Sequence, residues 1–158
     1  FTAATQADLI LAEFRAPYRG RSTPVNAWWG SFDLAVNLFS GRTADLPSPD
    51  IIMRNAMDSQ EVAIGWWPGD PRYGKAAFYA YVHPAQPGFD EGSISPAPGG
   101  WNSELGEWVL DWDVVRNADD PKEAALKFAR AVFSRACDVC DWDEGLASSA
   151  HGDPPPVR

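Results

Sequence analysis

Apolar and polar residues alternate strictly from Phe32 to Leu38. This period of two predicts a half-buried β-strand with Phe32, Leu34 and Leu38 packed into a core. Asp33 falls on the other face, where a carboxylate in mid-strand is an uncommon choice for simple solvent covering. We therefore expect a functional site on this second face.

The same alternation recurs at 61–67, 78–83 and 107–110 and predicts three further strands. The stretch from Pro84 to Asn102 is rich in Pro and Gly, has no period and is long for a connection. It favours a binding loop, a lid or a flexible insertion.

Two segments have helical spacing of apolar residues, 5–16 and 121–140. The second begins with Asp120 as the expected N-cap, Pro121 at the first helical position and Glu123 completing a capping box. A short helix is expected at 51–57. These elements predict an α+β fold, in which an antiparallel sheet of about four strands has both long helices packed on one face.

Length and composition predict one domain over residues 1–146, followed by a disordered, Pro-rich tail at 147–158. The net charge of −9 opposes binding to nucleic acid or to anionic membranes. No apolar run is long enough to span a bilayer and no signal peptide is recognisable, so we expect a cytoplasmic protein. Eight Trp residues exceed ordinary core needs and hint at binding.

The polar face of the predicted sheet would gather aromatic and polar side chains of the kind that line small-molecule pockets. Ser31 and Glu107 belong to this face. The candidate ligand-binding residues are Trp29, Asp33, Asn37, Glu61, Trp67, Tyr79, Tyr81 and His83.

Three hypotheses follow from this face. The preferred one is a site for a small polar or cationic molecule, with Asp33 and Glu61 as polar anchors. The second is an interaction module that buries the face in a homodimer or against a missing N-terminal half. The third is an acid–base hydrolase that uses paired carboxylates.

Other motifs favour structural roles, and no cofactor or metal is expected. Cys137 and Cys140 fall at a helix C-terminus, where the helix dipole opposes a thiolate, so we expect a reduced and inert pair. The Asp-Trp-Asp motifs at 111–113 and 141–143 occur where elements end and are explained by turn formation. No phosphate loop, nucleophile elbow or zinc-protease motif is present.

Several blocks resemble an uncharacterised bacterial family known only as a domain of unknown function. They are Trp29–Val36, Phe39–Arg42, Gly65–Gly69, Ala76–Tyr81, Pro87–Phe89 and Glu104–Glu107. The resemblance implies that this chain corresponds to the C-terminal half of longer proteins whose first half has a similar Trp-rich strand. Asn26 and His83 depart from the residues expected there, which argues against histidine-based chemistry.

Overall fold

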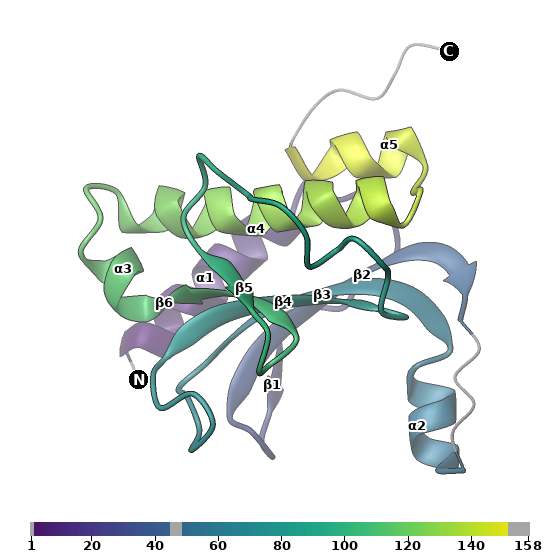
Figure 1. Cartoon of the computed structure of the whole chain (residues 1–158), viewed down its shortest axis with the longest axis horizontal. Coiled ribbons are helices and arrows are strands. Elements are labelled where there is room, and N and C mark those ends of the chain that lie inside the picture. The colour runs from purple at the N-terminus through teal and green to yellow at the C-terminus, as the bar shows by residue number, and fades with distance from the viewer. Residues whose placement is uncertain (1, 45–48, 152–158) are drawn as a thin grey trace.

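The computed structural model describes residues 2–44 and 49–151, and these form an antiparallel sheet covered by helices on one face (Figure 1). The strands are β1 (Asn26–Trp28), β2 (Asp33–Thr43), β3 (Ser59–Trp67), β4 (Ala77–His83), β5 (Gly100–Asn102) and β6 (Glu107–Asp111). The helices are α1 (Thr2–Arg15), α2 (Ile51–Ala56), α3 (Trp112–Arg116), α4 (Pro121–Val139) and α5 (Glu144–Ala147), followed by the 3₁₀ helix η1 (Ser148–His151).

The sheet has six strands in the order β1-β2-β3-β4-β6-β5, rather than the predicted four or so. The four predicted strands form its centre, and every neighbouring pair is antiparallel. The two additional strands, β1 and β5, lie at the edges and have three residues each. A strand this short cannot display an alternation, which explains why the pattern missed both.

The core lies between one face of the sheet and the two long helices, α1 and α4, as predicted (Figure 1). Leu11 and Phe14 of α1 and Phe133 of α4 are buried there against the apolar side chains of the central strands. The Asp120 side chain caps α4 by accepting a hydrogen bond from the backbone N–H of Glu123 at 3.0 Å. Amphipathic spacing thus sets both helices, and the Asp120 cap fixes the start of α4, so the two long helices are confirmed, although α1 begins at Thr2, three residues before the predicted start.

Phe32 is not a core residue, which corrects the predicted strand start. Its side chain is 76% exposed and its φ is +57°, so it belongs to the turn before β2. A residue with positive φ leaves the extended conformation, and the alternation of faces cannot continue through it. The alternation holds from Asp33 onward, with Val36 and Leu38 fully buried.

The connection between β4 and β5 packs on the helical layer. Phe89 and Ile94 are buried in the main core. The Phe89 carbonyl oxygen accepts hydrogen bonds from Trp108 Nε1 at 2.9 Å and from Arg135 Nε at 2.8 Å. These contacts fix the segment against β6 and α4, so it is not the flexible insertion that its composition suggested.

Residues just before the C-terminus are helical where a disordered tail was expected. Ser148–His151 form η1, and Ser149 is buried and accepts a hydrogen bond from the backbone N–H of Arg19 at 3.2 Å. Residues 152–158 of the predicted tail lie outside the described residues. Within the described part of the chain, no helix is both long and apolar enough to cross a membrane.

Candidate functional site

The face of the sheet opposite α1 and α4 carries a groove whose floor is set by the strand register. In one row, Ala35 of β2, Gly65 of β3 and Tyr79 of β4 lie side by side. In the next row, Ala63 lies beside Tyr81. Small residues on β2 and β3 next to large rings on β4 leave room above the middle of the sheet.

Gly65 allows the Tyr79 ring to lie across β3. A Cβ atom at Gly65 would lie 2.5 Å from both Cζ and the hydroxyl oxygen of Tyr79, and 2.6 Å from the Leu34 carbonyl oxygen. A side chain at this position would therefore displace either the ring or the backbone of β2. The glycine lets a tyrosine of β4 reach a residue of β2, two strands away.

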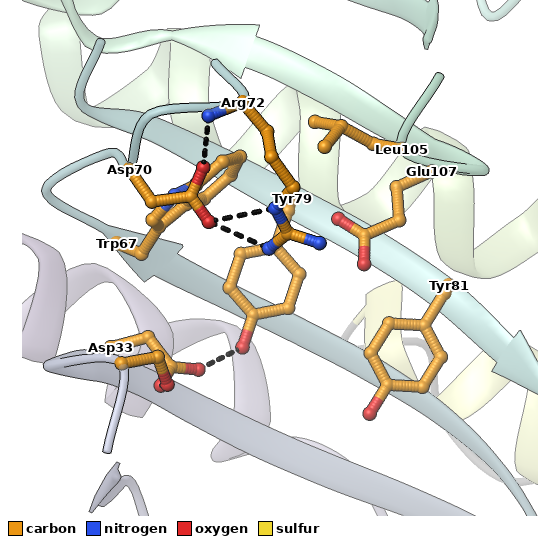
Figure 2. Close-up of a pocket in the computed structure, with 9 residues that line it drawn as sticks. Asp33, Trp67, Asp70, Arg72, Tyr79, Tyr81, Leu105 and Glu107 are labelled. Carbon is orange, nitrogen blue, oxygen red and sulfur yellow. Dashed lines mark hydrogen bonds and ion pairs between the residues drawn. The ribbon is translucent and has the colours of Figure 1, made fainter. Parts of the chain in front are cut away.

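That residue is Asp33, which is 8% exposed. Its Oδ2 accepts a hydrogen bond from the Tyr79 hydroxyl (Figure 2). Its Oδ1 accepts one from Ser31 Oγ. Burial, followed by the hydrogen bond and charge of Asp33, raises the pKa of Tyr79 well above its ordinary value. Because both carboxylate oxygens have internal partners, Asp33 has a structural role and holds the groove in shape.

One half of the groove is a cavity of about 240 Å³ beside the β3–β4 turn. Arg72 of this turn donates hydrogen bonds from Nε and a terminal nitrogen to Asp70 Oδ2, at 3.0 and 2.6 Å (Figure 2). Glu107 of β6 faces the same cavity. The cavity is lined by Ser31, Asp33, Trp67, Asp70, Arg72, Tyr79, Tyr81, Leu105 and Glu107.

The other half is a larger and more apolar cavity of about 460 Å³, bounded on one side by the end of α2 and by Met57. Glu61 enters it from β3 and accepts a hydrogen bond from Asn37 Nδ2 at 3.0 Å. The two cavities share Ser31, Asp33, Tyr79 and Tyr81 and so form one groove. The second cavity is also lined by Thr23, Asn26, Trp28, Ala35, Phe39, Ala56 and Ala63.

The pKa values of the groove's two glutamates, Glu61 and Glu107, are raised, which favours their protonated forms. Burial raises the pKa of Glu107 to about 7, against the lowering effect of the Arg72 charge and with a further rise from Asp33. Burial also raises the pKa of Glu61, although the Asn37 hydrogen bond and the His83 charge act in the opposite direction. Burial and the charges of Glu61, Glu107 and Asp33 raise the pKa of Tyr81 to about 12.

Rings form a continuous wall along the groove. Tyr79 and Tyr81 are stacked, with centroids 6.3 Å apart and planes 5° apart. Trp67 meets Tyr79 edge to face at 5.3 Å. The combination of a rigid aromatic wall with carboxylates of raised pKa is typical of sites that bind small polar molecules or move protons.

The structure brings six of the eight candidate residues to the groove, namely Asp33, Asn37, Glu61, Trp67, Tyr79 and Tyr81. Trp29 is 85% exposed in the β1–β2 turn and lines neither cavity. His83 also lies outside both, with its Nε2 2.9 Å from the Met57 carbonyl oxygen.

Sequence reasoning missed the residues that the turns and the edge strand contribute. Asp70 and Arg72 come from the β3–β4 turn, and Trp28 comes from β1. The sequence Pro68–Pro71 predicts the β3–β4 turn, but it does not predict toward which face of the sheet the turn projects. Gly65 in mid-strand was the available signal for a close approach above the sheet.

The remaining motifs have structural roles in this fold. Cys137 and Cys140 are free and buried, and burial raises the pKa of the Cys140 thiol to about 11. Asp111 accepts hydrogen bonds from Tyr73 at 2.5 Å and Lys75 at 3.0 Å, while Asp143 caps α5. Within residues 2–44 and 49–151, no three His, Cys, Asp or Glu side chains are grouped to hold a metal ion.

The fold and its groove thus define an α+β domain with helices on one sheet face and an acidic, aromatic groove on the other. Residues 1–149 match a family of unknown function, DUF5996, and the chain belongs to that family. No curated protein and no solved structure matches the chain.

Proposed function

We propose that this domain binds a small polar or cationic molecule in the groove on the open face of the sheet. The observation that carries the proposal is the arrangement around Tyr81, whose ring lines both cavities between the acidic side chains of Glu61 and Glu107. Concave sites with aromatic walls and a few converging polar groups are the usual form of small-molecule sites. The Asp33–Tyr79 hydrogen bond fixes the wall before any ligand arrives.

A thermal-shift screen with sugars, amines, amino acids and carboxylic acids tests this proposal. We expect compounds that raise the melting temperature of the protein, since a ligand that binds only the folded state stabilises it. The variant Asn26→Trp places a large ring at the wall of the larger cavity and should abolish the shift. Asn117→Trp, at the exposed end of α3, is the matched control and should retain it.

A second candidate function is an interaction module, and the exposed aromatic residues beside the groove favour it. Trp28, Trp29 and Phe32 at the β1–β2 turn are 52%, 85% and 76% exposed. If this chain corresponds to the C-terminal half of longer proteins, as the resemblance implies, a similar first half would be the partner that covers the same face. If no compound shifts the melting temperature and analytical ultracentrifugation shows a dimer that Trp29→Ser dissociates, this candidate replaces the first.

An acid–base hydrolase is the third candidate, favoured by the pKa of Glu107 near 7. A carboxyl group that titrates near neutrality is suited to donate or accept a proton. Hydrolysis of a compound found in the screen, with activity lost in Glu107→Gln while binding persists, would establish this reaction.

A further inference from the structure

We infer that the groove holds the positively charged end of its ligand over the ring of Tyr81, between the carboxylates of Glu61 and Glu107, and that the ligand is an organic ammonium compound. This inference rests on the proposed function and specifies the chemical class of the ligand.

The strand register surrounds Tyr81 with these two acids. Ala80 of β4 pairs with Trp108 of β6, so the next antiparallel position sets Tyr81 beside Glu107. Glu61 of β3 pairs with His83 and is therefore diagonal to Tyr81 on the same face. The charges of both glutamates raise the pKa of Tyr81, which agrees with their closeness to its hydroxyl group.

One oxygen of the Glu61 carboxylate, Oε2, has no hydrogen-bond partner among the residues that the structure describes. Glu61 is 5% exposed, and only its Oε1 accepts a hydrogen bond, from Asn37, among the described residues. Because Glu61 lines the larger cavity, a group bound there can reach the second oxygen. A buried carboxylate is stabilised by nearby positive charge, and a ligand cation would add to the charge of His83.

The side chain of Glu107 makes neither a hydrogen bond nor an ion pair with any residue in the described ranges. Arg72 is the one Lys or Arg that lines either cavity there, and its guanidinium group is bound to Asp70. The groove therefore presents the carboxyl groups of Asp33, Glu61, Asp70 and Glu107 against one guanidinium group. The face of an aromatic ring also attracts cations, so Tyr81 and its neighbours act in the same direction.

This arrangement couples cation binding to protonation of Glu107. Arg72 of the turn, Asp33 of β2, and Tyr79 and Tyr81 of β4 face this carboxyl group. Its pKa of about 7 means that it is largely protonated below neutral pH and ionised above it. A cation favours the ionised form, so affinity should fall as the pH falls through this range, and binding should release a proton.

The test compares choline with its neutral carbon isostere, in which a tert-butyl group replaces the trimethylammonium group. Titration calorimetry and NMR should show that choline binds at least about tenfold more tightly than the isostere at about pH 8. Choline affinity should fall about tenfold between about pH 8 and about pH 6, as expected for one group of pKa near 7. Glu107→Gln should weaken binding and remove this pH dependence, whereas Glu61→Gln should weaken binding and keep it.

Glu104→Gln is the matched control, because Glu104 is exposed on the β5–β6 turn and lines neither cavity. It should leave both affinity and pH dependence unchanged. Equal binding of choline and its isostere, or no binding of choline, would overturn the inference of a cationic ligand. If neutral compounds from the screen still bind and Asn26→Trp still blocks them, the groove binds small molecules but the ligand is not a cation. If no compound binds, both the proposed function and the inference of a cationic ligand are wrong.

Discussion

At the residue scale, Asp33 has a different role from the one its sequence position suggests. A carboxylate in mid-strand indicates an anchor for a ligand, but the structure engages its two oxygens with Ser31 and Tyr79. The sequence could not reveal this, because the contact spans two strands and depends on the bare backbone at Gly65. The groups left to face a ligand are Glu61 and Glu107.

Asp33→Asn should therefore lower the stability of the protein. An amide has one acceptor oxygen where the carboxylate offers two, so a charge-assisted hydrogen bond inside the structure is weakened. We expect a loss of about 1–3 kcal/mol in the free energy of unfolding, measured by chemical denaturation. Tyr79→Phe should cost a similar amount, and the double variant should cost less than the sum of the two.

Asp119→Asn, on the exposed segment before α4, is the control and should change the free energy of unfolding by less than about 0.5 kcal/mol. A loss of the same size in the control and in Asp33→Asn, or additive costs of Asp33→Asn and Tyr79→Phe, would show that the buried hydrogen bond does not stabilise the fold.

At the scale of elements, the periodic segments could be predicted and the short ones could not. The helices at α1 and α4 and the strands β2, β3, β4 and β6 extend over enough residues for their patterns to be unambiguous. Strands of three residues, such as β1 and β5, and the five-residue helix α3 depend on contacts with neighbours rather than on a period. Of these three elements, β1 lines the groove, together with residues from turns, and this part of the groove's wall was therefore missed.

Two phenylalanines, Phe32 just before β2 and Phe78 in β4, test where β2 begins. Phe32→Ala should change the free energy of unfolding by less than about 0.5 kcal/mol, because the ring is 76% exposed in a turn. Phe78→Ala should cost about 3–5 kcal/mol, because that ring is 1% exposed in the core. Chemical denaturation of both variants measures this difference, and a large loss in Phe32→Ala would place β2 one residue earlier, as the alternation suggested.

At the scale of the whole molecule, the two faces of the sheet differ: one packs against the helices to form the core, and the other carries the groove. The face beneath α1 and α4 contains the large apolar core, which sets the stability of the domain. The opposite face has a smaller buried cluster of Ala35, Trp67, Ala77, Tyr79 and Val109, with polar groups around it. Figure 1 shows that β1, the β3–β4 turn and α2 project on this side and flank the open face. Changes in the groove can therefore alter binding while the core remains intact.

NMR of alanine methyl groups locates the ligand, because alanines lie both on the groove floor and in the helical core. With a compound from the screen, we expect shifts at Ala35 and Ala63 on the groove floor and none at Ala129 and Ala136 in the helical core. Shifts confined to the helical layer would contradict the account. So would shifts at Ala35 and Ala63 that follow protein concentration without any compound, because they would show that the open face is buried against a second copy.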